Sequence, residues 1–169
     1  MTPAIRALAV LGLAACAAAA RPVAPPPSAR LSSLALLTAE GQRVTLGELA
    51  RGRPVVIDLF ATWCEPCREQ LAHTDAMARR PPGDVLVIAV DVGEERALVE
   101  RYARRQGLTL PIYLDPELRF QDSLGSDVIP LLVVLDRAQR IVHRGSGLDA
   151  SAREVIARVA ATPAEDAEP

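Results

Sequence analysis

Two cysteines separated by two residues, Cys64 and Cys67, form the pair of side chains best suited to covalent chemistry. They follow the apolar run 55–60 and lie where a helix is expected to begin, because Pro66 is favoured in the first turn of a helix. A helix start leaves backbone N–H groups free and carries the positive end of the helix dipole, and both features stabilise a thiolate. Within one helical turn the two sulfurs are close enough to bridge. The spacing therefore predicts a dithiol that performs thiol–disulfide exchange.

Of the two cysteines, Cys64 is predicted to attack a substrate disulfide and Cys67 to resolve the mixed disulfide that results. A structural disulfide is one competing interpretation, but a bridge over so short a loop removes little chain entropy, which favours a redox role. A zinc site is another, but there is no second cysteine pair, and His73 and His143 do not lie at zinc-finger spacing. We expect no metal and no cofactor other than the Cys64–Cys67 disulfide.

Four neighbouring residues are further candidates for the site. Asp58 is the only charged side chain in its apolar strand, so we expect it to be buried with a raised pKa and to exchange a proton with Cys67. The alternative is an aspartate at a strand edge, bonded to backbone N–H groups. Trp63 is expected to flank the exposed sulfur on a docking surface rather than to pack in the core. Glu65 either selects partners and shifts the cysteine pKa values or is simply solvated, and Pro66 both tunes the motif and starts the helix.

The remaining pattern predicts one α/β domain. Half of the 169 residues are apolar, enough for a single core, and the net charge of −2 argues against a nucleic-acid partner. The order of elements mixes parallel crossovers with antiparallel hairpins, which indicates a sheet with helices on both faces. The predicted elements are a hairpin (34–37 and 43–46), a helical turn (46–50), a strand (55–60), a helix (64–80), a strand (85–90), a helix (95–106), a strand (112–114), a helical segment (116–124), a second hairpin (131–135 and 141–143) and a final helix (150–161).

The two ends of the chain are predicted to lie outside this domain, which spans 31–161. Residues 1–15 have the positive start and apolar stretch of a signal peptide, and the residues up to Cys16 resemble a bacterial lipobox, in which the cysteine is acylated. The alternative is ordinary cleavage within the alanine run. Residues 16–30 are rich in Ala and Pro and predict an extended linker, and the acidic tail 162–169 predicts disorder. We therefore expect a lipoprotein in the cell envelope or periplasm, anchored to a membrane.

Four motifs in order carry a family resemblance across residues 34–160. They are Phe60–Glu69 around the cysteines, Ala89–Glu95 at a strand-to-helix turn, Val128-Ile129-Pro130 before an apolar strand, and Leu135-Asp136-Arg137 in the closing hairpin. Together they resemble the thioredoxin-like superfamily, in particular its exported TlpA/ResA-type branch of cytochrome c maturation. The resemblance implies a thioredoxin-like fold, a central mixed β-sheet flanked by helices, with an N-terminal β-hairpin extension. It implies a monomeric thiol–disulfide oxidoreductase that reduces client proteins such as apocytochrome c with electrons from a membrane thiol donor.

The resemblance also assigns site residues and shows two departures. Glu94 matches the acidic residue that the family carries near the dithiol, although acids are favoured at helix starts in any case. Pro130 is expected to form a cis peptide bond with Ile129, to present a backbone edge to substrate and to keep metals off the dithiol. The branch commonly has Asn where Asp58 stands and Thr where Leu131 stands, so the details of proton transfer and of the substrate groove are expected to differ here.

Two other functions remain open from the sequence. Thr62 lies upstream of Cys64, and a nearby Thr is what a thioredoxin-like peroxidase needs, although Cys67 makes a dithiol switch more natural. A copper-binding or redox-sensing module would use the same thiolates, since Cu(I) prefers soft ligands, but the chain has no Met-rich or His-rich segment.

Overall fold

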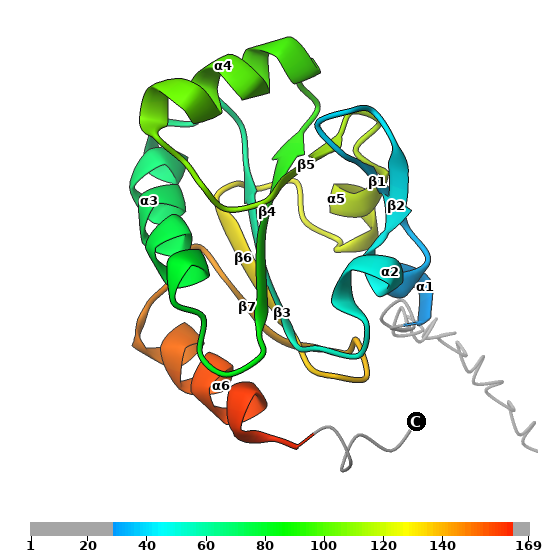
Figure 1. The fold of residues 1–169 in the computed structure, drawn as a ribbon, viewed down its shortest axis with the longest axis vertical. Helices are drawn as coiled ribbons and strands as arrows, with labels where there is room; N and C mark the ends of the chain where they lie inside the picture. Colours follow the sequence, from blue (N-terminus) through cyan, green and yellow to red (C-terminus); the bar gives the residue numbers. More distant parts are fainter. Residues whose placement is uncertain (1–28, 164–169) are drawn as a thin grey trace, which may run out of the picture.

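The computed structural model describes residues 29–163. Its strands are β1 (Ala35–Leu37), β2 (Arg43–Thr45), β3 (Val55–Phe60), β4 (Leu86–Val92), β5 (Ile112–Asp115), β6 (Leu131–Leu135) and β7 (Ile141–Gly145). Its helices are α1 (Ala29–Ser32), α2 (Leu46–Ala50), α3 (Glu65–Arg79), α4 (Arg96–Gln106), α5 (Arg119–Ser123) and α6 (Ala150–Ala161). In Figure 1 the central strands stand between α3 and α6 on the left and α1, α2 and α5 on the right.

The strands form one seven-stranded mixed sheet in the order β2-β1-β5-β4-β3-β6-β7. β3, β4 and β5 run parallel, and the hairpins β1–β2 and β6–β7 add antiparallel strands at the two edges. This arrangement confirms the predicted mixed sheet with helices on both faces and an N-terminal hairpin. The parallel order places the carboxyl ends of β3 and β4 at the same edge of the sheet.

β3 is buried at every residue, as expected for a strand covered by helices on both faces. Because side chains alternate along a strand, Ile57 and Leu59 enter the larger hydrophobic cluster, while Val56 packs with Val134 and Ile156 beneath α6. Asp58 has the same parity as Val56. It therefore points to the face of the sheet that α3 and α6 cover.

Several element boundaries differ from the sequence prediction. β4 runs through Val92, two residues beyond the predicted end, because Asp91 and Val92 pair with Leu114 and Asp115 of β5. The helical segment predicted over 116–124 is shorter, because Leu118 adopts a left-handed conformation (φ 58°) and closes a turn onto Asp115 before α5 begins.

The ends of the described region show smaller differences. α1 begins at Ala29, two residues before the predicted start of the domain. α6 is capped by Asp149, whose side chain accepts a hydrogen bond from the Ala152 N–H, so Asp149 rather than Ser151 is the cap. The predicted signal peptide, Cys16, most of the linker and residues 164–169 of the tail lie outside the described residues. Within residues 29–163, none of the helices combines the length and the apolar character needed to cross a bilayer.

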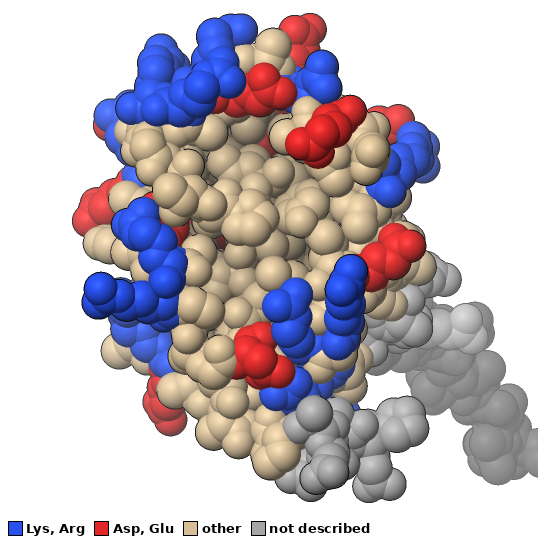
Figure 2. Space-filling model, viewed as in Figure 1, with Lys and Arg blue, Asp and Glu red and all other residues tan. Residues whose placement is uncertain are grey.

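Charged side chains of both signs lie around the rim of the molecular face seen in Figure 2, and the middle of that face is uncharged. At the top of this view, arginines gather over α4. Two arginines of this helix, Arg96 and Arg104, lie 3.6 and 3.8 Å from the Glu100 carboxylate. The basic groups of α4 are therefore interleaved with acidic ones on a solvated helix face.

Candidate active site

The Cys64 and Cys67 sulfurs are joined in a disulfide at the start of α3, with their Cα atoms 5.3 Å apart. Cys64 is the N-cap residue of the helix, and its sulfur accepts a hydrogen bond from the Cys67 N–H at 3.3 Å. Pro66 lies in the first turn, as expected from its missing N–H. Cys64 is 5% exposed and Cys67 is 0% exposed, so Cys64 is the sulfur nearer to solvent.

The surface around the disulfide is formed by exposed residues of the same motif. Trp63 is 73% exposed, which excludes the core-packing interpretation of this side chain. Glu65 is exposed and forms an ion pair with Arg68 at 2.8 Å. Pro66 is exposed beside it. A partner protein that approaches Cys64 therefore meets an indole ring, a proline ring and an ion pair.

The Ile129–Pro130 peptide bond is cis, as the resemblance implied. Leu131, the next residue, is buried at the start of β6 and pairs with Leu59 near the end of β3. Pro130 is thus placed beside the end of β3 that leads into the cysteine turn. Ile129 packs against the hydrophobic cluster that includes both cysteines.

Asp58 is fully buried under α3, which confirms its predicted burial. Its carboxylate accepts hydrogen bonds from the Gln70 side-chain amide and the Thr74 hydroxyl, each at 2.7 Å. These partners are side chains, which argues against an edge aspartate bonded to backbone N–H groups. Burial raises the pKa of Asp58 from 3.8 to about 7, and the hydrogen bonds from Thr74 and Gln70 partly oppose this rise. A group with this pKa can take up and release a proton at neutral pH.

Sequence reasoning did not single out Gln70 and Thr74. Cys67, Gln70 and Thr74 are three and four residues apart, so they share the face of α3 that lies on the sheet. All three are buried. The signal that could have found them is the helical period counted from Cys67, combined with the expectation that Asp58 needs hydrogen-bond donors.

Glu94 contacts the turn before the cysteines. Its carboxylate accepts hydrogen bonds from the Thr62 backbone N–H and from the Thr62 hydroxyl, the latter at 2.7 Å. Glu94 is not the cap of α4, because that position is Glu95, whose side chain makes no capping bond. Glu94 therefore holds the chain two residues ahead of Cys64.

Asp91 is a third residue that the sequence prediction missed. It is fully buried near the end of β4, and its Oδ1 accepts a hydrogen bond from the Glu94 N–H at 3.1 Å. Burial raises the pKa of Asp91 to about 8, and a hydrogen bond with the Glu94 side chain and the charges of Glu94 and Asp115 add to the rise. The available signal was an acidic residue directly after the apolar run 85–90, whereas Asp58 was identified as the only charge inside an apolar run.

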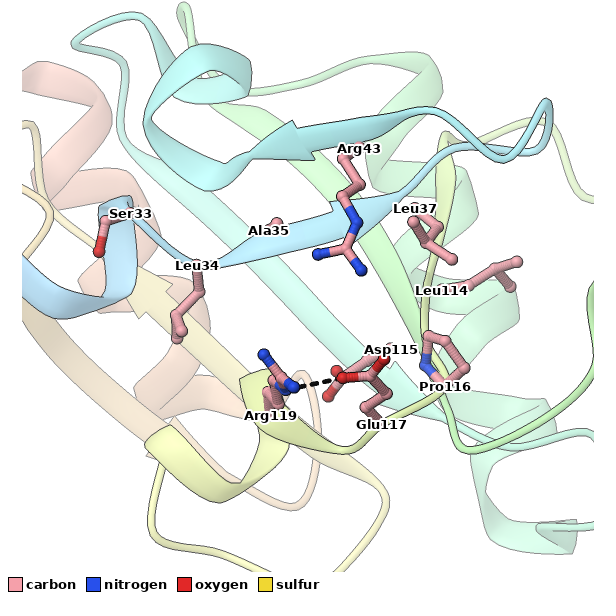
Figure 3. A pocket seen from close by; sticks show the side chains of 10 residues that line it. All are labelled: Ser33, Leu34, Ala35, Leu37, Arg43, Leu114, Asp115, Pro116, Glu117 and Arg119. Atoms are coloured by element: carbon pink, nitrogen blue, oxygen red, sulfur yellow. Dashed lines mark ion pairs between the residues drawn. The ribbon is translucent and has the colours of Figure 1, made fainter.

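A pocket elsewhere in the fold does not belong to this site. It lies between β1 and the loop from β5 to α5, where Arg43 and Arg119 point into it and Arg119 pairs with Glu117 at 2.7 Å (Figure 3). None of its lining residues belongs to the turn that carries the cysteines. Within residues 29–163, no group of three or more His, Cys, Asp or Glu side chains is placed to hold a metal ion.

Comparisons with known proteins agree with this architecture. A family model described as Redoxin matches residues 20–157. The ResA thiol-disulfide oxidoreductase of Halalkalibacterium halodurans is 29% identical over 109 residues, which cover 64% of this chain and 61% of that protein. The thiol:disulfide interchange protein DsbD of Ralstonia nicotianae is 32% identical over 96 residues, which cover 53% of this chain and 14% of that protein.

Among solved structures, StoA from Bacillus subtilis has a TM-score of 0.62 at 20% identity, covering 73% of this chain and 94% of that one. The chain spans between 51% and 61% of the length of the ResA proteins that it matches. The fold is the thioredoxin-like fold that this chain shares with StoA, and the sequence is similar to proteins of the ResA/TlpA type. Because the Redoxin model matches most of the chain, the chain belongs to the Redoxin family.

Proposed function

We propose that this protein is a thiol–disulfide oxidoreductase that reduces disulfides of client proteins. The observation that carries the proposal is the Cys64–Cys67 disulfide at the start of α3, with one sulfur nearer to solvent and the other fully buried. The helix start stabilises a thiolate on Cys64, and the buried carboxyl of Asp58 lies under the same helix.

The reaction begins with the reduced dithiol. The Cys64 thiolate attacks one sulfur of the client disulfide and forms a mixed disulfide with it, while the client S–S bond breaks and the other client sulfur leaves as a thiolate. Cys67 then gives its proton to Asp58 and attacks the Cys64 sulfur, which releases the second client thiolate. Two electrons pass to the client, and the protein ends in the oxidised form that the structure shows.

The exposed surface around Cys64 supports a protein rather than a small molecule as the substrate. Trp63 and Val128 are 73% and 63% exposed, and apolar side chains of this size gain free energy when a partner covers them. Val128 directly precedes the cis Ile129–Pro130 bond, whose backbone edge we assign to the client peptide.

The finer assignment follows from the relatives and from the family resemblance. We assign apocytochrome c as the client class and a membrane thiol donor of the DsbD kind as the source of electrons, supported by the matches to ResA and DsbD. The N-terminal sequence supports export to the cell envelope and attachment through lipidated Cys16. Replacement of Cys16 by Ala should release the protein from washed membranes, and continued retention would argue against the anchor.

The dithiol roles are tested by reduction of a disulfide-bonded protein such as insulin. Cys64→Ser should abolish turnover, and Cys67→Ser should accumulate a mixed disulfide that is visible on a non-reducing gel. His73→Gln, an exposed position on α3, serves as the control and should match the wild-type rate. Sustained turnover by either cysteine variant would contradict the proposal.

One contact of Thr62 argues against a peroxidase function. The Thr62 hydroxyl donates to Glu94 at 2.7 Å, so it is already committed away from the Cys64 sulfur. We therefore keep disulfide reduction as the function.

A further inference from the structure

The turn that carries Cys64 is held by a residue from a distant part of the chain. The Cys64 N–H donates to the Ala61 carbonyl at 3.1 Å, and Thr62 lies within this turn. Both donors of Thr62, its backbone N–H and its hydroxyl, go to the two carboxylate oxygens of Glu94, which is 32 residues further along the chain. A carboxylate that accepts two hydrogen bonds from one residue fixes the position of that residue.

Glu94 is fixed in turn by Asp91. Between them, Gly93 adopts a left-handed conformation (φ 82°) that turns the chain back at the end of β4, so that the Glu94 N–H reaches the Asp91 carboxyl. Asp91 pairs across the sheet with Phe60, the last residue of β3 before the cysteine turn. The contacts therefore run from Asp91 through Glu94 to Thr62, and from there to the turn of Cys64.

One carboxyl oxygen of Asp91 is buried without a hydrogen bond in the described part of the chain. This atom is Oδ2, and its lack of a partner among the described residues favours the neutral form of the carboxyl. Residues 29–163 contain no ion pair to either carboxyl. An uncompensated second negative charge at this place is unfavourable.

The charged groups that act on the Asp91 carboxyl are the acidic Glu94 and Asp115. From α4, the titratable Tyr102 packs its ring on Phe60, the strand partner of Asp91. β5 contributes Asp115, and β3 contributes Asp58 on the same face of the sheet. On the inward face of α3, Cys67 is oxidised in the structure. Asp75, on the same face, accepts hydrogen bonds from Thr109 and Leu110 and not from the Asp91 region. Burial is the main reason that Asp91 holds its proton into the mildly alkaline range, with a pKa of about 8, and the acidic neighbours Glu94 and Asp115 add to the rise.

We propose that Glu94, held at its backbone by the buried neutral carboxyl of Asp91, clamps Thr62, and that proton loss from Asp91 loosens the turn carrying Cys64. Glu94 and Asp91 are thus positioning residues, since they act on the sulfur through Thr62. The inference rests on the proposed function for its effect on exchange, but the clamp itself is a property of the fold. In the protonated state the turn holds Cys64 at the start of α3, where its thiolate is stabilised; in the ionised state repulsion between the two carboxylates weakens the hold on Thr62.

The clamp can be measured without any exchange reaction. In the oxidised protein neither cysteine titrates, so the NMR shift of the Thr62 amide, followed from pH 6 to pH 10, reports on the Asp91 and Glu94 carboxyls. We expect an inflection near the Asp91 pKa of about 8. Asp91→Asn, which mimics the neutral carboxyl, should abolish the inflection, while Asp58→Asn and the control Glu95→Gln should retain it. No inflection in the wild type, or an inflection that persists in Asp91→Asn, would overturn the proposal.

Exchange kinetics provide the functional readout. Glu94→Gln replaces one acceptor oxygen by an amide that cannot accept from Thr62, so the rate of client reduction should fall about tenfold, the factor that one hydrogen bond to a charged group supplies. Asp91→Asn should match the wild type at pH 6.5, and the ratio of its rate to the wild-type rate should rise above pH 8. This ratio cancels the ionisation of Cys64 itself.

The outcomes separate the two proposals. If the wild-type protein shows the amide inflection but reduces no disulfide, the clamp is supported and the proposed function is contradicted. If the wild type reduces disulfides but the ratio of the Asp91→Asn rate to the wild-type rate does not change with pH, the function is supported and the clamp is contradicted. Should Asp91→Asn fail to fold, Thr62→Val, which lacks the hydroxyl donor, should lower the rate while Thr62→Ser restores it; equal rates for the two variants would count against the clamp.

Discussion

At the scale of single residues, the site contains two buried carboxyls with different surroundings. Asp58 lies under α3 with two side-chain donors, whereas Asp91 lies at the end of β4 against another acid. Burial raises the pKa of both, to about 7 for Asp58 and about 8 for Asp91. We assign proton transfer with Cys67 to Asp58 and positioning of the cysteine turn to Asp91, because their contacts lead to different parts of the site.

Asp58 should make stability depend on pH. In the unfolded chain it ionises near its ordinary pKa of 3.8, whereas the folded protein holds the proton to about pH 7. The free energy of unfolding should therefore fall as the pH rises from about 4 to about 7, because the unfolded state releases the proton first. The Asp58→Asn substitution should raise the free energy of unfolding by as much as about 4 kcal/mol at pH 8 and by little at pH 4.5, as measured by urea unfolding.

The same variant should reduce disulfides more slowly than the wild type at neutral pH, since Cys67 loses its proton acceptor. A variant that equals the wild type in both stability and rate across this pH range would show that Asp58 does not ionise in the folded protein. His73→Gln is again the control, because its side chain is exposed on the same helix.

At the scale of elements, the turns that end β3 and β4 bring the site together. β3 leads into the turn of Cys64, and β4 leads through Gly93 to Glu94. Since the two strands are parallel neighbours, both turns lie at one edge of the sheet. The start of β6, with cis Pro130, meets β3 at the same edge through the pairing of Leu131 with Leu59.

A side chain at Gly93 should destabilise the fold. Its φ of 82° is strained for any L-residue, and a Cβ there would lie 3.2 Å from Cδ2 of Leu118. Gly93→Ala should lower the free energy of unfolding by about 1–3 kcal/mol, measured by urea unfolding. Gly52→Ala is the matched control, because Gly52 also has positive φ (74°) but open space around it. Gly52→Ala should lower the free energy of unfolding by less than Gly93→Ala does. Equal losses would show that the contact with Leu118 contributes nothing.

The elements were largely predictable from the sequence, because apolar runs and helical periods are local signals. The contacts of Thr62, Gln70 and Thr74 were not, because each joins segments between 12 and 32 residues apart and depends on how α3 and β4 pack on β3. Asp91 was missed for a related reason. The predicted strand ended at Val90, and it is the pairing of Asp91 with Phe60 of β3 and with Leu114 of β5 that extends it.

At the scale of the whole molecule, one arginine connects three separate parts of the chain. Arg137, whose side chain is 9% exposed, forms a bidentate ion pair with Asp84 at 2.8 and 2.9 Å. It also donates to the carbonyls of Gly52 and Thr162. The loops before β3 and β4 and the end of α6 therefore meet at a single guanidinium group.

Arg137→Lys should destabilise the protein although it keeps the charge. A lysine ammonium cannot reproduce the planar fork that serves Asp84 and two carbonyls at once, so we expect a loss of about 1–3 kcal/mol. Arg140→Lys is the control, because Arg140 is exposed and its pair with Asp136 contributes little. Thermal unfolding of both variants, followed by circular dichroism, would show the difference, and equal melting temperatures would contradict it.

The exposure of Trp63 gives the molecule a built-in optical signal. It is the only tryptophan in the sequence and precedes Cys64 directly, and a disulfide beside an indole quenches its fluorescence. Emission should brighten when the bridge opens and dim when it closes again. Each catalytic cycle can therefore be followed in real time, in unlabelled protein, from the light that one side chain emits.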